Sequence, residues 1–245
     1  MQAESAGRVL LTGGSGRLGR ELSRHLEMTT PPRSELDLTK SDTIVKSIER
    51  YKPDLVVHAA AYTDVRGAER ERQACWAVNV AGTTSLVREL VPRKIPLVHI
   101  SSDYVFYGDR GHYLENDQPG PARNHYGLSK LVAEEVVRVH QNALVIRTSF
   151  RPRQWTYPIA FDDVYTSQDY VDVIGPDIAL AIRYFDSVPF NTLHIATERK
   201  SVFELAQRRK PDVVRGSRAS AGVDLPEDIS LDISRWQALR EKLIS

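Results

Sequence analysis

A glycine-rich turn near the N-terminus constrains the fold of this chain more than any other feature. The segment Arg8–Thr12 (RVLLT) is a short apolar run with the composition of a buried strand, and Gly13, Gly16 and Gly19 follow it. Leucines then recur at helical spacing, at Leu18, Leu22 and Leu26. Strand, glycine turn and helix in this order are typical of the first unit of a dinucleotide-binding fold.

Each glycine has its own role in such a turn. Gly13 allows the sharp bend after the strand, Gly16 lets the backbone approach a pyrophosphate, and Gly19 allows the helix to pack closely on the strand. The amide groups at the start of the helix attract the anion. A Walker A loop is excluded, because it needs Lys and Ser or Thr where Arg20 and Glu21 stand.

Strand and helix patterns alternate through the first 150 residues. Further strands are predicted at Asp54–Ala60, Pro96–Ser101 and Ala143–Thr148, and helical patterns cover residues 41–51, 70–91 and 126–140. This alternation predicts an α/β fold with a doubly wound parallel sheet of the Rossmann type.

The pattern loosens after Phe150. Residues 151–170 hold prolines, aromatic and polar residues without periodicity, and helical segments return near residues 176–185, 201–209 and 234–244. We therefore predict a NAD(P)-binding Rossmann domain over residues 1–150. A small substrate-binding lobe is predicted over residues 151–245, interleaved with the last Rossmann elements.

Composition argues against several classes of protein. Lys and Arg number 33 against 32 Asp and Glu, so the basic excess of a nucleic-acid-binding protein is missing. No apolar run approaches the ~18 residues of a membrane span. The one cysteine, Cys75, allows no internal disulfide, and neither it nor the seven histidines form a metal-binding motif. We expect a cytoplasmic protein without nucleic-acid, membrane or metal partners, with His58 and His99 as core residues.

The segment at which the second strand of a dinucleotide-binding fold ends distinguishes NAD from NADP. A carboxylate there binds the ribose 2′-hydroxyl group of NAD, whereas an arginine accepts the 2′-phosphate of NADP. Residues 29–34 read TTPPRS, so Arg33 favours NADPH. Glu35 lies close enough in the sequence to leave NADH open.

A tyrosine and a lysine form the candidate catalytic pair. Tyr126 and Lys130 belong to the only YxxxK in the chain, and this spacing puts the phenol and the ammonium group on one helix face. The preceding strand ends at Ser102, at the sheet edge where doubly wound folds bind ligands. A nearby ammonium group lowers a tyrosine pKa, and such a phenol can protonate a carbonyl oxygen as hydride reaches the carbon.

Five short motifs carry a family resemblance. TGGSGRLG, HAAAYTDV, ISSDYVF, YGLSK and IRTSF, in this order, resemble the extended short-chain dehydrogenase/reductase family, and within it the nucleotide-sugar reductases. The resemblance extends to the C-terminus through residues 230–234 (SLDIS). It implies an NADPH- or NADH-dependent oxidoreductase that reduces the keto group of a 4-keto-6-deoxy nucleotide sugar, on a path to deoxysugars for surface glycans.

The resemblance also implies roles for individual residues. Ser102 would orient the carbonyl group, Tyr126 would donate the proton, and Lys130 would contact the cofactor ribose and tune Tyr126. Cofactor contacts are implied for Gly13, Ser15, Gly16, Arg17 and Leu18 at the pyrophosphate, Asp37 and Leu38 at the adenine, and Ala59, Ala60 and Ala61 along the dinucleotide. Substrate contacts are implied for Thr63, Val65, Asp103 and Tyr104, and for Phe150.

Some positions depart from the family pattern. Related dehydratases have Asp-Glu where this chain has Asp103-Tyr104, so the second acid for eliminating water is missing and reduction is favoured. Phe150 replaces a usual tryptophan and Arg66 an acidic residue, and the stretch beyond Phe150 is shortened. Candidates to hold a nucleotide diphosphate are Arg151, Arg153, Arg215 and Arg218. The aromatic residues that either wall the sugar pocket or fill the small core are Trp155, Tyr157 and Tyr165.

Two other functions stay open at this point. A dinucleotide-binding regulatory subunit without activity is compatible with the shortened lobe, although the intact Ser102, Tyr126 and Lys130 argue against it. An epimerase on the same scaffold is the other alternative, because fold alone does not specify the reaction. Related proteins also suggest a homodimer, in some cases with Mg²⁺ at the contact, for which this sequence has no motif.

Overall fold

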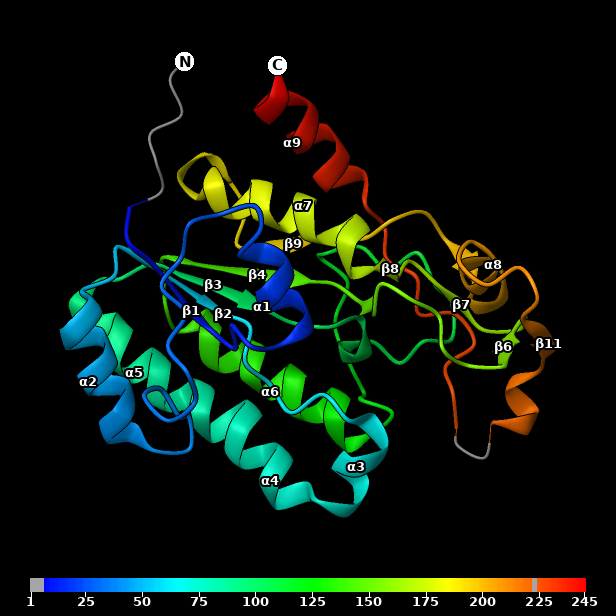
Figure 1. The fold of residues 1–245 in the computed structure, drawn as a ribbon, viewed down its shortest axis with the longest axis horizontal. Coiled ribbons are helices and arrows are strands. Elements are labelled where there is room, and N and C mark those ends of the chain that lie inside the picture. The colour runs from blue at the N-terminus through cyan, green and yellow to red at the C-terminus, as the bar shows by residue number, and fades with distance from the viewer. Residues whose placement is uncertain (1–6, 222–223) are drawn as a thin grey trace.

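The computed structural model describes residues 7–221 and 224–245 of the 245-residue chain. Its centre is a five-stranded parallel sheet in the order β1-β2-β3-β4-β9 (Figure 1). These strands are β1 (Val9–Thr12), β2 (Leu55–His58), β3 (Leu97–Ile100), β4 (Ala143–Arg147) and β9 (Thr192–His194). The predicted α/β fold with a parallel Rossmann-type sheet is confirmed; the first six residues of the predicted 1–150 domain lie outside the described residues.

At β1 the connections of the sheet change direction, so that the chain adds neighbours on both sides of this strand. Leu11 N donates to Thr29 O and Thr29 N donates to Val9 O, each at 2.8 Å, so Thr29 forms a bridge on one side of β1. Strand β2 pairs in parallel with the other side. The end of β1 is therefore the switch point at which doubly wound sheets bind their ligands.

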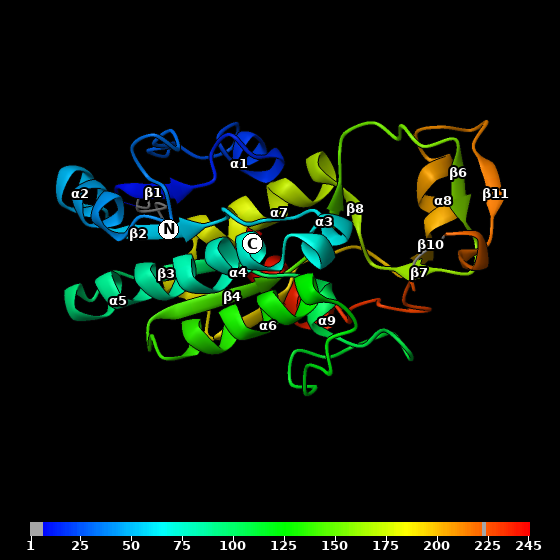
Figure 2. The same cartoon turned by 90° about the horizontal axis from the view of Figure 1, so that it is seen from below.

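Helices cover both faces of the sheet (Figure 2). One face carries α1 (Arg17–Leu22), α7 (Val171–Arg183) and α9 (Ser234–Ile244), and the other carries α2 (Ser41–Tyr51), α5 (Thr83–Arg93) and α6 (His125–Arg138). Leu11 is buried on the first face and Leu10 on the second. A strand covered on both faces needs apolar residues at consecutive positions, which explains the apolar runs in the sequence. Within the described residues, no helix is both long and apolar enough to cross a membrane.

The helical pattern expected over residues 70–91 is divided in the structure. It contains α3 (Val65–Arg70), α4 (Arg72–Trp76), a π-helical segment (Ala77–Gly82) and the start of α5. The hydroxyl groups of Thr83 and Thr84 donate to the carbonyl oxygens of Asn79 and Val80, at 2.7 and 2.8 Å. These side chains compete with main-chain donors for the same carbonyl groups, and this is where the regular ladder is interrupted.

Two other elements differ from the prediction. Helix α7 begins at Val171 instead of near residue 176, because Val171, Ile174 and Ile178 are buried on one face of it. That burial outweighs the backbone donor that Pro176 lacks. Strand β9, with three residues, is too short to give a pattern in the sequence and was not expected.

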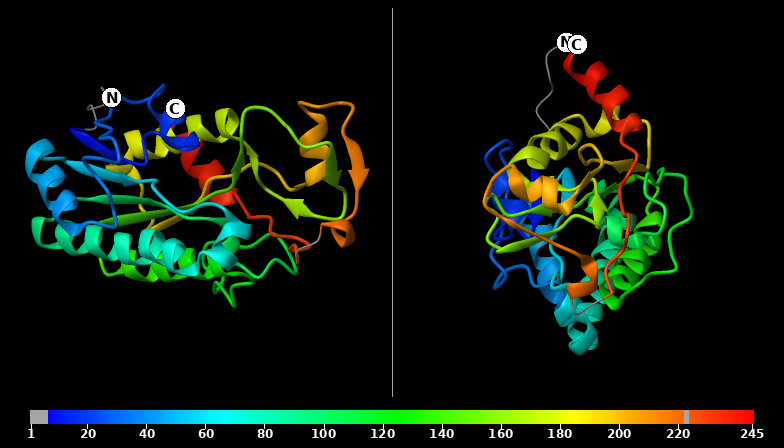
Figure 3. Two further views of the ribbon diagram at one scale, coloured as in Figure 1. Left: turned by 60° about the horizontal axis from the view of Figure 1, so that its bottom comes forward. Right: turned by 90° about the vertical axis from the view of Figure 1, so that its right-hand side faces the viewer.

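A small lobe lies beyond the carboxyl ends of the main strands (Figure 3). Its ladders pair β5 (Phe150–Arg151) with β8 (Asp169–Tyr170), β7 (Tyr165–Thr166) with β10 (Lys200–Ser201), and β6 (Ile159–Phe161) with β11 (Val214–Gly216). The remaining helices are α8 (Val202–Gln207) and the 3-10 turns η2 (Asp103–Val105), η3 (Phe185–Ser187) and η4 (Arg218–Ser220). The lobe has its own hydrophobic core around Trp155, Tyr170 and Phe203. Between its parts the chain returns to the main sheet through α7 and β9.

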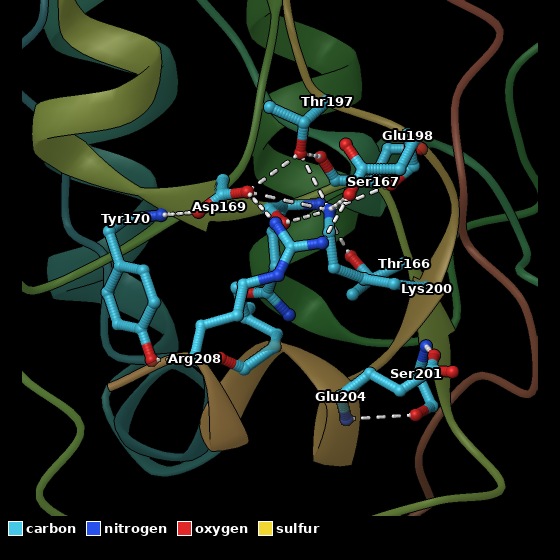
Figure 4. A network of polar contacts seen from close by, with 12 residues as sticks. Thr166, Ser167, Asp169, Tyr170, Thr197, Glu198, Lys200, Ser201, Glu204 and Arg208 are labelled. Carbon is cyan, nitrogen blue, oxygen red and sulfur yellow. Dashed lines mark hydrogen bonds and ion pairs between the residues drawn. The ribbon is translucent and has the colours of Figure 1, made fainter. Parts of the chain in front are cut away.

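A polar network holds the ladders of the lobe near their junction with the sheet (Figure 4). Asp169 accepts hydrogen bonds from Arg208 Nη1 at 2.8 Å and Thr197 Oγ1 at 3.1 Å, and its Oδ2 lies 3.7 Å from Lys200 Nζ. Lys200 Nζ donates to the Thr197 hydroxyl group and to the carbonyl oxygens of Gln168 and Glu198. The network joins β8 to β10 and to the end of α8, which follow one another directly and come much later in the sequence than β8.

Candidate active site

The glycine turn lies between β1 and α1, against the residues that follow β2. Gly13 has a φ of +78°, and a Cβ atom there would lie 2.6 Å from the Ala60 nitrogen. A Cβ atom at Gly19 would lie 2.3 Å from the Gly13 oxygen, so α1 packs on the turn at a distance that only glycine allows. Gly16 is exposed at the start of α1. The turn therefore has the close backbone approaches that a pyrophosphate-binding loop requires.

Most of the predicted cofactor residues lie around this turn. Exposed positions at its tip are Ser15, Gly16 and Arg17. Half-buried positions after β2 are Ala59, Ala60 and Ala61, and Ala60 N donates to Thr12 Oγ1 at 3.2 Å. Leu18 differs, because its side chain is buried in the core and only its main chain remains for a cofactor.

The predicted adenine-side residues lie beyond the Thr29 bridge. The Arg33 side chain is 78% exposed, and its Nε lies 3.5 Å from Asp37 Oδ2. Asp37 also accepts hydrogen bonds from Thr39, which lower the pKa of its carboxyl group. Arg33 is exposed enough to receive a 2′-phosphate, and Asp37 competes for its charge. Leu38 is buried in the core and does not present its side chain to this site.

Ser102, Asp103 and Tyr126 form a polar cluster at the carboxyl end of β3. Ser102 Oγ donates to Asp103 Oδ1 at 3.0 Å. Burial raises the pKa of the Tyr126 phenol, and the nearby Ser102 hydroxyl group opposes this increase. Burial also raises the pKa of Asp103, to about 6. Tyr126 therefore keeps its proton at neutral pH, as a proton donor must.

Lys130 lies one turn further along α6 with a buried ammonium group. Its Nζ donates to Ile100 O at 2.8 Å and lies 3.4 Å from His99 Nε2. Burial lowers its pKa to about 8, and the charge of Glu134 opposes this decrease. The predicted lowering of the Tyr126 pKa by Lys130 does not appear: burial raises this pKa, and the Ser102 hydroxyl group is what opposes the increase.

A buried ion pair underlies these groups. Glu134 lies one turn beyond Lys130 and accepts hydrogen bonds from Arg147 Nε at 3.0 Å, Arg147 Nη2 at 2.9 Å and Ser101 Oγ at 2.5 Å. The side chains of Glu134 and Arg147 are both 0% exposed. Because a fully hydrogen-bonded buried pair has one geometry, it fixes α6, β4 and the end of β3 relative to one another. Ser102, Tyr126 and Lys130 lie on the elements that it joins.

The predicted substrate residues surround Tyr126 unevenly. The Tyr104 ring is edge-on to the Tyr126 ring, with centroids 5.8 Å apart. Phe150 is half-buried at the start of β5 and packs on the main core. Thr63 is exposed and Val65 is half-buried on the segment that leads into α3, which packs on α6. Tyr104 is thus placed against the candidate proton donor, whereas Thr63 lies on the surface.

Three of the four candidate phosphate-binding arginines have acidic partners. Arg153 pairs with Glu21 at 2.6 Å, Arg215 with Asp162 at 3.1 Å, and Arg218 with Glu227 at 2.9 Å. Arg151 has no ion-pair partner among residues 7–221 and 224–245. The three aromatic candidates are also separated: Trp155 belongs to the lobe core, Tyr157 is 54% exposed, and Tyr165 packs under the Arg199 guanidinium group.

The two histidines expected in the core are buried. His58 Nδ1 lies 2.8 Å from Thr12 Oγ1 and its Nε2 lies 2.9 Å from Thr83 Oγ1, and burial lowers its pKa to about 3. His99 contacts Lys130 through Nε2, and burial lowers its pKa. No group of three His, Cys, Asp or Glu in the described part of the chain is arranged to hold a metal ion.

Sequence reasoning missed Asn79 and the Glu134–Arg147 pair. Asn79 binds the main chain of Tyr62 through both amide atoms and donates to Ser129 Oγ at 2.9 Å, and so joins the segment after β2 to α6. No pattern in the sequence singles out this asparagine. A signal did exist for the ion pair, because Arg147 is a charged residue in an otherwise apolar strand.

Comparison with known proteins identifies the family. The family model described as "RmlD substrate binding domain" matches residues 7–157. This chain belongs to that family. Its membership of the extended short-chain dehydrogenases/reductases, inferred from the motifs, is thereby confirmed. Among the curated relatives of this RmlD-family chain is a probable low-salt glycan biosynthesis reductase of Haloferax volcanii, 38% identical over 159 residues, which are 58% of this chain and 53% of the relative.

A second relative is a dTDP-4-dehydrorhamnose reductase of Aggregatibacter actinomycetemcomitans, 35% identical over 61% of this chain and 52% of that protein. The matched segment thus spans about half the length of these curated relatives.

Solved structures match over nearly the whole chain. A hypothetical dTDP-4-dehydrorhamnose reductase from Sulfolobus tokodaii has a TM-score of 0.83 and 33% identity, with 94% of each chain covered. A dTDP-4-dehydrorhamnose reductase from Bacillus anthracis in complex with NADP also has a TM-score of 0.83, with 26% identity, and 97% of this chain and 99% of that chain are covered. The UDP-glucose 4-epimerase of Thermus thermophilus, at 19% identity and a TM-score of 0.68, shares the fold.

Proposed function

We propose that this RmlD-family chain is an NADPH-dependent reductase of a 4-keto-6-deoxy nucleotide sugar, resembling dTDP-4-dehydrorhamnose reductase and acting in deoxysugar biosynthesis for surface glycans. The observation that carries the proposal is the convergence of Ser102, Tyr126 and Lys130 at the carboxyl end of β3, at the same edge of the parallel sheet as the glycine turn that follows β1. The NADP bound to the Bacillus anthracis relative and the exposed Arg33 support NADPH over NADH.

The chain's own residues fit this cofactor. Because Gly13 and Gly19 have no side chains, the backbone packs closely at the turn and the start of α1 stays open to a pyrophosphate. The amide groups of residues 15–18 would bind this pyrophosphate. The Lys130 ammonium group donates hydrogen bonds to Ile100 O and His99 Nε2 and has its third donor left for a ribose hydroxyl group. The predicted division of labour follows: residues 1–150 bind the cofactor, and the lobe within 151–245 covers the sugar nucleotide.

The reaction adds a hydride to the carbonyl carbon and a proton to its oxygen. When bound, the reduced nicotinamide supplies the hydride. The Ser102 hydroxyl group turns from Asp103 to the carbonyl oxygen and orients it, and Tyr126 transfers its phenolic proton to the same oxygen. The Lys130 charge stabilises the resulting phenolate until solvent returns a proton. Tyr104, Asp103 and Phe150 would border the sugar, with Thr63 and Val65 at the rim.

The test is NADPH oxidation with a dTDP-4-keto-6-deoxyhexose, comparing wild type with Tyr126→Phe. We expect the variant to lose about 10²–10⁴-fold in kcat/KM, which is the usual contribution of a positioned acid. Tyr51→Phe is the matched control, because Tyr51 lies on α2 and donates to Glu35 on the surface. Unchanged turnover in Tyr126→Phe would remove Tyr126 from the mechanism.

Other outcomes would change the reaction class. NADPH binding without turnover on any keto sugar would favour the regulatory subunit, and turnover with catalytic amounts of NAD(P) would favour an epimerase. The reaction would take place in the cytoplasm, since a chain whose one cysteine is buried and free suits a reducing compartment. A homodimer stays a prediction, which sedimentation equilibrium tests.

A further inference from the structure

Four buried polar side-chain atoms have no hydrogen-bond partner in the described residues: His99 Nδ1, Thr148 Oγ1, Arg151 Nε and Trp155 Nε1. Such atoms are rare in folded proteins because burying them without a partner is costly. The first lies beside Lys130, and the other three lie on the segment 148–155 that follows β4. The concentration of unmatched donors in this one segment points to a ligand that completes them.

Arg151 is the charged member of this group. Its guanidinium carbon lies 5.3 Å from the Trp155 ring centroid and 6.0 Å from that of Tyr157. Trp155 is 8% exposed and is itself one of the residues with an unmatched donor. The rings hold the guanidinium plane by cation–π attraction and take none of its N–H donors. An arginine held in this way is prepared for a planar or tetrahedral oxyanion.

The position of Arg151 relates it to the proton donor. It is the second residue of β5, where it pairs with Tyr170 of β8 at the entrance of the lobe. Its charge lowers the pKa of the Tyr104 phenol, although burial of that phenol has the larger, opposite effect. The Tyr104 ring in turn contacts the Tyr126 ring. The free cation therefore acts on Tyr104, the residue whose ring contacts the candidate proton donor.

We infer that Arg151 binds an oxyanion of the substrate, either a phosphate of the nucleoside diphosphate or a carboxylate on the sugar, and so selects anionic substrates. The inference rests on the proposed function for the identity of the reaction, but the binding step is measurable without turnover. Arg153, two residues further on, cannot take this role while it is paired with the buried Glu21.

The test is calorimetric binding of three probes, dTDP, UDP-glucose and UDP-glucuronate, to wild type and Arg151→Gln. We expect the variant to lose at least about tenfold in affinity, because a hydrogen-bonded charge contributes that much or more. A loss for all three probes assigns the diphosphate, and a loss confined to UDP-glucuronate assigns a sugar carboxylate. Arg8→Gln, in which an exposed arginine just before β1 loses Asp54, is the matched control and should bind as wild type does.

A second variant distinguishes a loss of anion binding from a loss of folding. Arg151→Lys keeps the charge without the guanidinium fork and should recover part of the lost affinity. Equal affinities of wild type and Arg151→Gln for every probe would overturn the inference, and so would a wild type that binds none of them. If wild type oxidises no NADPH with any keto sugar while Arg151→Gln still loses affinity for dTDP, the proposed function fails and the anion site stands.

Discussion

Two lysines of this chain are equally buried and have different surroundings. Lys130 on α6 is 3% exposed, and Lys200 on β10 is 4% exposed. Lys200 lies within 4 Å of two carboxylates, Asp169 at 3.7 Å and Glu198 at 3.8 Å, and donates three hydrogen bonds. Lys130 donates two, to Ile100 O at 2.8 Å and to His99 Nε2 at 3.4 Å; no described carboxylate lies within 4 Å of it.

The difference shows how surroundings separate a structural charge from a reactive one. An ammonium group has three donors, so Lys200 is saturated by the protein and Lys130 is not. Burial lowers the pKa of both, but Glu198 and Asp169 oppose the decrease at Lys200, whereas the pKa of Lys130 falls to about 8. A buried cation with an unused donor and a perturbed pKa, at the sheet edge that also carries a glycine turn, is the pattern of a functional site.

The largest effect should come from removing the reactive lysine. We expect Lys130→Met to lose about 10²–10⁴-fold in kcat/KM for NADPH-dependent turnover, because the phenolate of Tyr126 loses its stabilising charge. Its free energy of unfolding at pH 7 should not fall, since no carboxylate is left unpaired. Steady-state kinetics and urea unfolding measure the two effects. A variant that unfolds easily but keeps its kcat/KM would make Lys130 a structural residue.

A pH titration of stability tests the same lysine without substrate. In the unfolded chain Lys130 holds its proton up to about pH 10.5, whereas in the folded chain it releases it near pH 8. Between these values the unfolded state binds more protons, so this group makes folding more favourable as pH rises, by roughly 3 kcal/mol at most. Subtracting the pH–stability curve of Lys130→Met from that of wild type removes the contributions of the other titratable groups. A flat difference between pH 8 and 10.5 would contradict the lowered pKa.

Removing the structural lysine should have a smaller and different effect. In Lys200→Met, the buried Asp169 carboxylate loses one partner but keeps Arg208 at 2.8 Å. We expect a loss of about 1–3 kcal/mol in the free energy of unfolding, and an unchanged dissociation constant for NADPH, whose proposed site at the glycine turn lies outside the lobe network. Urea unfolding and NADPH fluorescence are the measurements. A weakened NADPH affinity would show that the lobe network supports the cofactor site.

The two lysines also differ in how far the sequence reveals them. Lys130 is recognisable because its partner Tyr126 lies four residues away, and local spacing predicts their common helix face. Lys200 depends on Asp169, 31 positions earlier, and nothing local connects them. The parallel sheet is also predictable from local sequence, because its longer strands are continuous apolar runs. Strand β9 and the ladders of the lobe, two or three residues each, exist only through tertiary pairing.

The same distinction applies to Arg151 and Arg153. Both are arginines of one loosely patterned segment, and as sequence they are equivalent candidates for a phosphate. The structure separates them, because Glu21 on α1 is 3% exposed and pairs with Arg153. An acid 132 residues away therefore decides which arginine is free, and single-sequence reasoning has no access to that pairing.

A third lysine tests whether distance or burial determines these effects. Lys46 on α2 lies 3.3 Å from Asp42, closer than Lys200 lies to either of its acids, but the two side chains are 75% and 64% exposed. If the distance between the charges determined the energetic cost, Lys46→Ala would lower the free energy of unfolding more than Lys200→Met does. Because water screens an exposed pair, we expect its free energy of unfolding to stay within about 0.5 kcal/mol of wild type. Urea unfolding at low and high salt measures this, and a loss comparable to that of Lys200→Met would show that burial is not what distinguishes the three lysines.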